Sequence, residues 1–181
     1  VEINIGMDRA GVEPGKTTLN FCKYILSLKH LNYLGVMAWE GHTVGVLNPE
    51  EKNQMISDSL GQLTQTIELL KIHDLEPKII SGAGSGTYQI STKYNIFNEI
   101  QSGGAVFTDE AYTKWGATTL SSLYLRSSVT SRPNSRRIIT DAGWKTLPAW
   151  SVSPKPIELE EVESVSMSAE HGIVRTKTKN S

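Results

Sequence analysis

The chain has 181 residues, of which 38% are hydrophobic and 20% are charged, and its formal net charge is -1. This composition is typical of one globular domain or of a domain with a smaller annex, and the near-neutral charge gives no electrostatic surface for nucleic acid. No apolar run approaches the roughly 20 residues of a membrane span, so we expect neither a nucleic-acid partner nor a membrane partner. The single cysteine, Cys22, excludes an internal disulfide and favours a cytoplasmic, reducing compartment.

The first half of the sequence alternates between predicted strands and predicted helices. Residues 1–5 alternate apolar and polar side chains, which predicts a strand, and a helix is expected from Thr17 or Thr18 to about His30. Residues 34–38 form a short apolar run that is typical of a strand buried on both faces.

A second and longer helix is predicted to begin at Pro49. Its apolar side chains recur at spacings of four and three, which places them on one face of the helix: Ile56, Leu60, Leu63, Ile67 and Leu70. Strands are expected at 78–81 and 94–100, and residues 105–107 should be extended. Because strands and helices alternate in this order, we predict parallel strands joined by right-handed crossovers.

The stretch 79–88 stands out because a predicted strand runs directly into a loop of glycines and small hydroxyl residues. Such a loop lets backbone N–H groups converge on an anion, so it suits a phosphate group. The dinucleotide fingerprint does not fit, since Thr87 stands where the third glycine belongs, and no P-loop lysine follows. In parallel sheets functional loops lie at the carboxyl ends of the strands, which here also carry Arg9, 39–42 and 101–104.

The second half of the sequence has a different pattern, without a predicted helix. Two antiparallel strands, 123–130 and 136–141, are expected around a turn at 132–135. An exposed edge strand is expected at 158–165, followed by a turn at 168–172 that leads into the apolar residues 173–174. We therefore predict an α/β chain, in which a parallel β/α domain over residues 1–112 precedes a mainly antiparallel β domain over 113–181.

Five motifs in order resemble a known family. Residues 1–12 are similar to the strand-and-loop signature of the fold-type III pyridoxal-phosphate (PLP) enzymes, whose archetype is alanine racemase. The other four narrow the resemblance to the branch that holds D-threonine aldolases and eukaryotic-type D-serine dehydratases: 81–88, 99–103, 141–145 and 168–172. The resemblance implies that residues 1–112 are part of a parallel β/α (TIM-like) barrel.

The resemblance implies cofactor contacts for eight residues. Arg9 would lie near the phenolic oxygen of PLP, where a fixed cation favours the anion. Trp39, at a position that is mostly Tyr in this branch, would pack on the pyridine face. Gln101 would stand beside the pyridine nitrogen, where the racemases use Arg. The phosphate would be met by a hydroxyl-bearing loop and by the backbone of a glycine pair: Ser85, Gly86, Thr87, Gly103 and Gly104.

The resemblance implies that neither the catalytic lysine nor the metal site lies within these residues. In the family, the lysine that binds PLP covalently precedes the strand with which this sequence begins. The metal site, a His followed two residues later by Cys or Asp, lies nearer the C-terminus than Ser181 reaches. We therefore interpret the chain as a fragment without both ends, which holds the cradle of PLP without its anchor or its divalent metal (Zn or Mn), and which is inactive alone.

The function that the resemblance implies is that of a PLP-dependent lyase acting on D-β-hydroxy-amino acids, as a possible homodimer. Cleavage of D-threonine to glycine and acetaldehyde is the favoured reaction, and conversion of D-serine to pyruvate and ammonia remains an alternative. A non-catalytic PLP-binding carrier is an alternative of another class, and a sugar-phosphate-binding barrel is a third.

Simpler structural roles remain open for several side chains. Arg9 could pair with Asp8 or Glu13 on the surface, and His42 could be an ordinary surface or core histidine. Glu40 could be a carboxylate at the sheet edge without any chemistry.

Overall fold

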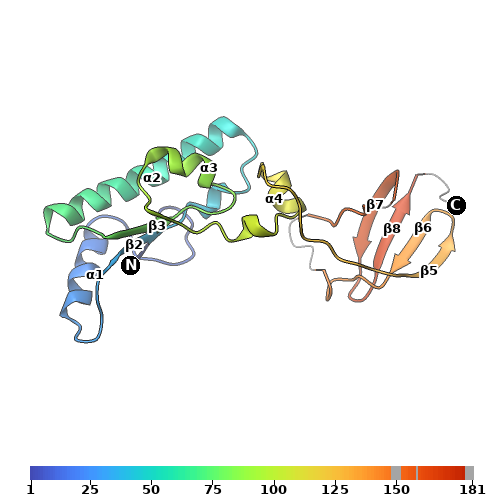
Figure 1. The fold of residues 1–181 in the computed structure, drawn as a ribbon, viewed down its shortest axis with the longest axis horizontal. Coiled ribbons are helices and arrows are strands. Elements are labelled where there is room, and N and C mark those ends of the chain that lie inside the picture. Colours follow the sequence, from blue (N-terminus) through green and yellow to red (C-terminus); the bar gives the residue numbers. More distant parts are fainter. Residues whose placement is uncertain (148–151, 158, 178–181) are drawn as a thin grey trace. The chain divides into compact units, whose positions relative to one another are not determined.

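The computed structural model describes residues 1–147, 152–157 and 159–177. Their contacts divide the chain into two compact units, shown in Figure 1. Unit 1 comprises Val1–Val106 and Trp115–Thr118, and unit 2 comprises Phe107–Lys114 and Thr119–Ser181. The predicted boundary at residue 112 falls within a short helix of unit 2, α4 (Glu110–Lys114).

Unit 1 is built on a parallel sheet of four strands. In spatial order these are β1 (Glu2–Ile3), β2 (Gly35–Ala38), β3 (Ile79–Gly82) and β4 (Glu99–Ile100). All three neighbouring pairs are parallel, which confirms the predicted parallel strands. The approach of β2 to β3 requires glycine at position 35, because a Cβ there would lie 1.9 Å from the carbonyl oxygen of Ile79.

Two helices, α1 (Lys16–Ser27) and α2 (Pro49–Ile72), follow the first two strands close to the predicted places. The helix α2 begins sharply because the Asn48 side chain accepts hydrogen bonds from the backbone N–H groups of the first turn, at 2.9 and 3.1 Å. Pro49 then occupies the first helical turn, where its missing N–H costs nothing. None of the helices in the described residues is both long and apolar enough to cross a membrane.

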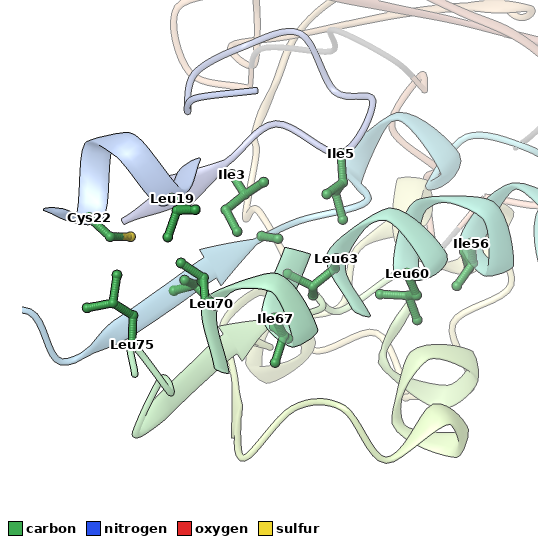
Figure 2. Packing of buried hydrophobic residues seen from close by; sticks show 12 residues of the cluster. Ile3, Ile5, Leu19, Cys22, Ile56, Leu60, Leu63, Ile67, Leu70 and Leu75 are labelled. Carbon is green, nitrogen blue, oxygen red and sulfur yellow. The ribbon is translucent and has the colours of Figure 1, made fainter. Parts of the chain in front are cut away.

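The core of unit 1 joins the sheet to both helices (Figure 2). The face of α2 predicted to be apolar is buried throughout: Ile56, Leu60, Leu63 and Leu70 are 0% exposed and Ile67 is 4% exposed. The other members of the cluster come from the first strand segment, α1, β2 and the segment after α2: Ile3, Ile5, Leu19, Cys22, Val36, Ala38 and Leu75. Burying one such side chain contributes about 1.5–3 kcal/mol, so this cluster is the main support of the sheet.

Short helical turns replace much of the extended structure predicted after β3. The helix α3 (Tyr88–Ser91) continues into the 3-10 turn η2 (Thr92–Tyr94), so only Glu99–Ile100 of the predicted strand 94–100 pairs in the sheet. A further 3-10 turn, η3 (Gly104–Val106), covers most of the next segment that was predicted to be extended. Elements of three or four residues are too short to leave a periodic pattern in the sequence.

Unit 2 contains an antiparallel sheet of four strands, which confirms the character predicted for this half. The spatial order is β5 (Val129–Asn134), β6 (Arg137–Thr140), β8 (Gly172–Thr176) and β7 (Val162–Met167). The helix α4 was not predicted. It is capped by Asp109, whose carboxylate accepts from the N–H groups of Ala111 and Tyr112, both at 3.0 Å.

The first hairpin of unit 2 turns later than predicted. The turn lies at 135–136 instead of 132–135, and Pro133 is part of β5. Since β5 is an edge strand, a residue without an N–H group is tolerated there. The other edge strand is β7, which confirms the expected exposed edge, although Glu158 of that prediction lies outside the described residues.

Candidate functional site

All four strands of unit 1 lead, at their carboxyl ends, into segments rich in glycine and polar residues. These segments are 4–9 after β1, 39–43 after β2, 83–87 after β3 and 101–104 after β4. Because neighbouring parallel strands end at the same edge of a sheet, the four segments follow one edge, which we call the rim. The rim contains all eight residues for which the sequence predicts cofactor contacts.

Arg9 and Trp39 come together at the rim. The guanidinium carbon of Arg9 lies 5.1 Å from the centroid of the Trp39 ring, a cation–π contact. A guanidinium nitrogen also lies 3.5 Å from Oε1 of Glu2. The ion partner of Arg9 is therefore neither Asp8 nor Glu13, the two carboxylates considered from the sequence.

Two glycines set the position of the Trp39 indole. A Cβ at Gly41 would lie 2.7 Å from two carbons of the ring, and a Cβ at Gly84 would lie 2.7 Å from Nε1. Both distances are well below van der Waals contact, so the ring as placed requires glycine at these positions. The indole N–H itself is buried and has no hydrogen-bond partner among the described residues. Unpaired buried donors are uncommon in proteins and are a feature of functional sites.

The glycine loop after β3 closes around Thr87. The Thr87 hydroxyl accepts a hydrogen bond from the N–H of Gly84 at 3.1 Å, and the Thr87 N–H donates to the Gly84 carbonyl at 3.0 Å. Gly86 packs closely on Val44, since a Cβ there would lie 2.9 Å from a methyl carbon. Ser85 and Thr87 are 8% and 1% exposed. The Thr87 hydroxyl therefore shapes the loop from within.

Gln101 is fixed by hydrogen bonds to two other residues. Its Nε2 donates to Oγ of Ser81 at 2.7 Å, and the Ser81 hydroxyl donates to Oε1 of Glu99 at 2.5 Å. The backbone N–H of Gln101 donates to the carbonyl of Gly82 at 3.0 Å, which continues the ladder beyond β4. Ser81 is buried, whereas Glu99 and Gln101 are exposed.

The backbone at Gly103 is open. No atom lies within 4 Å of a Cβ built there, and the adjacent Gly104 begins η3. The hydroxyl of Ser102 is buried without a hydrogen-bond partner in the part of the chain that the structure describes. Main chain without side chains in front of it allows a ligand group to approach the backbone closely.

Glu40 and His42 connect the rim to the helices, and each also has one buried polar atom, Oε2 and Nδ1, without a hydrogen-bond partner among the described residues. Glu40 is fully buried, and its Oε1 accepts from the Ser91 hydroxyl of α3 at 2.5 Å. The His42 ring packs against Gly6, where a Cβ would lie 2.7 Å from Cε1. The Nε2 of His42 lies 3.4 Å from the hydroxyl of Ser59 on α2.

Lys52 on α2 holds Val44, the residue that directly follows rim segment 39–43, although the sequence analysis did not single it out. Its ammonium donates to the carbonyl oxygens of Val44 and Trp115, both at 3.2 Å, and the residue is only 7% exposed. Burial lowers the pKa of Lys52 because desolvation disfavours the charged form. Its spacing of four residues from Ile56 is the signal that places it on the buried face of the helix.

A family model described as "alanine racemase, N-terminal domain" matches residues 1–111 of the chain. The chain belongs to this family. A second model, described as "putative serine dehydratase domain", matches residues 122–181. Both matches confirm the resemblance inferred from the sequence motifs.

Similarity to alanine racemase-like proteins extends over nearly the whole chain. The 3-hydroxy-D-aspartate aldolase of Paracoccus denitrificans (strain Pd 1222) and a D-threonine aldolase of Arthrobacter sp are each 25% identical, and each match covers 98% of this chain and 48% of the relative. The crystal structure of D-threonine aldolase from Filomicrobium marinum has a TM-score of 0.88 and 29% identity, over 99% of this chain and 49% of that one. The chain therefore spans about half the length of these relatives, and the predicted α/β fold is confirmed.

The rim fits the parts of PLP, the cofactor that the alanine racemase family implies. The glycine loop and Gly103 offer small residues and accessible backbone for a phosphate group. Trp39 offers a flat aromatic surface, and Arg9 and Gln101 offer a cation and a neutral amide. The unpaired indole N–H adds a donor that no described residue satisfies. Within the described ranges, no group of three or more His, Cys, Asp or Glu side chains could hold a metal ion.

Proposed function

We propose that the whole protein is a PLP-dependent lyase of D-β-hydroxy-amino acids, and that it cleaves D-threonine to glycine and acetaldehyde. The similarity of almost the entire chain to D-threonine aldolases and to a 3-hydroxy-D-aspartate aldolase supports this proposal most strongly. The substrates in these names share a D-configured amino acid with a hydroxyl group on Cβ. The chemistry of the rim supports the same reaction class.

Each rim residue has a defined task in this proposal. PLP, when bound, supplies the electron sink for breaking a bond at Cα. Arg9 favours the anionic form of the phenolic oxygen, and Trp39 covers one face of the ring and excludes water from it. Gln101 binds the ring nitrogen. The phosphate is held by the loop Ser85, Gly86 and Thr87 and by the backbone of Gly103 and Gly104.

The covalent anchor of PLP and a divalent metal, Zn or Mn, would come from parts of the whole protein outside residues 1–181. Lys52 is unsuited to be the anchor, because its amine is buried and is held by two carbonyl oxygens. The metal would act as a Lewis acid on the β-hydroxyl group of the substrate.

The test is a product assay on the PLP-loaded whole protein with D-threonine, 3-hydroxy-D-aspartate and D-serine. Glycine and acetaldehyde from D-threonine are the expected products, and L-threonine serves as the control for stereochemistry. Pyruvate and ammonia from D-serine, with no glycine from D-threonine, would instead indicate a dehydratase. The match of residues 122–181 to the putative serine dehydratase domain supports this second candidate. Retention of PLP without turnover of any of these substrates would indicate a carrier.

A further inference from the structure

Gln101 ends a row of three hydrogen-bonded side chains on one face of the parallel sheet. Ser81 and Glu99 are partners across β3 and β4. Gln101 follows Glu99 by two residues, and strand alternation turns side chains two residues apart to the same face. The two hydrogen bonds of this row are therefore a direct result of the strand register.

The chemistry of the row decides which end of the Gln101 amide meets Ser81. A glutamate carboxylate accepts hydrogen bonds and cannot donate, so the single hydroxyl proton of Ser81 goes to Glu99. The Ser81 oxygen can then only accept from Gln101, and the NH₂ group of the amide supplies the donor. The reversed amide would place its carbonyl oxygen against an oxygen that has no proton left to give.

We propose that Glu99 and Ser81 are positioning residues that turn the carbonyl oxygen of Gln101 away from Ser81, so that position 101 presents a hydrogen-bond acceptor to the ligand. The inference rests on the proposed function, in which Gln101 lies beside the ring nitrogen of PLP. An acceptor at this point selects a ring nitrogen that carries a proton. A protonated ring withdraws electrons more strongly, which suits the cleavage of a bond at Cα.

The experiment uses the whole protein loaded with PLP that carries ¹⁵N in the ring, because the ¹⁵N chemical shift separates a protonated from an unprotonated ring nitrogen. In the unsubstituted protein we expect a protonated nitrogen at neutral pH. Glu99→Gln keeps the size of the side chain but allows residue 99 to donate as well as accept. The Ser81 hydroxyl can then donate to either neighbour, so the Gln101 amide is no longer held in one orientation. The proton-binding constant of the ring nitrogen should fall by about tenfold, the effect of losing an oriented hydrogen bond to a charged group.

Two further variants separate positioning from a general structural effect. Glu68→Gln removes an exposed carboxylate that pairs with Lys71 on α2, and it should leave the ring nitrogen unchanged. In the double variant Glu99→Gln with Gln101→Glu, both oxygens at position 101 are acceptors in either orientation, so protonation should be restored. A structural defect at position 99 would not be repaired in this way.

An unprotonated ring nitrogen in the unsubstituted protein would overturn the inference, and so would a Glu99→Gln variant with unchanged protonation. Retention of PLP is measured separately, by the amount that remains after dialysis. Loss of PLP from the unsubstituted protein would contradict the proposed function itself, and the inference would fall with it.

Discussion

Two glycines of the rim differ in the space around them, so a Cβ atom would meet another side chain at one position and nothing at the other. At Gly84 a Cβ would lie 2.7 Å from the indole nitrogen of Trp39, whereas at Gly103 nothing lies within 4 Å. Both glycines belong to segments for which phosphate contacts are proposed. A substitution to alanine therefore tests the contact with Trp39 at one position and the backbone alone at the other.

We expect Gly84→Ala to weaken the binding of PLP to the whole protein by about tenfold or more. The added methyl group forces the indole to move, and overpacking of this kind costs about 1–3 kcal/mol, where 1.4 kcal/mol corresponds to a factor of ten. The dissociation constant is measured by fluorescence titration with PLP. Gly61→Ala on α2, where no atom lies within 4 Å of a built Cβ either, is the control outside the rim and should stay within about twofold. Equal effects of both substitutions would contradict the proposed contribution of Trp39.

Lys52 should make the stability of the protein depend on pH in the alkaline range. Its folded-state pKa lies below the ordinary value of 10.5 because of desolvation, so the unfolded chain binds the proton more tightly. Between the lowered pKa and 10.5 the unfolded state carries more protons, and stability rises with pH in that window.

The comparison with Lys52→Met isolates this effect, because methionine does not titrate. The difference in Tm, unsubstituted protein minus variant, should grow in favour of the lysine as the pH rises from about 7 to about 10. Thermal scans of the whole protein at several pH values measure this difference. A difference that is flat or falls with pH would show that the Lys52 amine is not desolvated.

At the scale of elements, two substitutions in α2, only two residues apart, should change the free energy of unfolding in opposite directions. Leu63 is 0% exposed, so Leu63→Ala should lower the free energy of unfolding by about 2–5 kcal/mol. Gly61 has no atom within 4 Å of a built Cβ, so Gly61→Ala should raise it by about 0.5–1 kcal/mol through the better helix propensity of alanine. Urea unfolding midpoints of the whole protein provide the measurement. A loss of stability in Gly61→Ala would contradict the open surroundings of that glycine.

At the scale of the whole molecule, unit 1 exposes both backbone and apolar surface. The outer side of β1 is partly paired by Val12, which exchanges backbone hydrogen bonds of 2.9 Å with Glu2 and Asn4. The strand β4 lies at the other edge and is exposed. Large apolar side chains of α1 and of the segment that follows it are also exposed: Phe21 at 41%, Tyr24 at 58%, Leu31 at 52% and Leu34 at 54%. Large exposed apolar patches are found at interaction sites or promote aggregation.

We therefore expect residues 1–181, expressed alone, to aggregate or to fold poorly and to bind PLP only weakly. An unpaired strand edge and exposed apolar side chains both favour association between copies of the chain. Size-exclusion chromatography and a thermal scan test this expectation, with the whole protein as the reference. A soluble monomer with a sharp, cooperative transition would contradict this expectation.

The sequence by itself determined the parallel sheet, the two long helices, the antiparallel character of the second half and the family. Each of these has a local signal: the buried face of α2 follows from spacings of three and four, and the glycine loop follows directly on a strand. The placement of the eight predicted cofactor residues along one rim follows from the same strand order. Their contacts with PLP remain a prediction.

Only the tertiary structure decided how the side chains at the rim are held. The hydrogen bond from Ser81 to Glu99 joins residues 18 positions apart, and the bond from Lys52 to Trp115 joins residues 63 positions apart. A local sequence pattern therefore could not predict either bond. The short turns α3 and η3 were missed because they contain too few residues for a period. Glu40 is buried through its contact with α3, a helix that the sequence did not predict. Periodicity encodes which face of an element is apolar, whereas the partner of a polar group is chosen when distant segments meet.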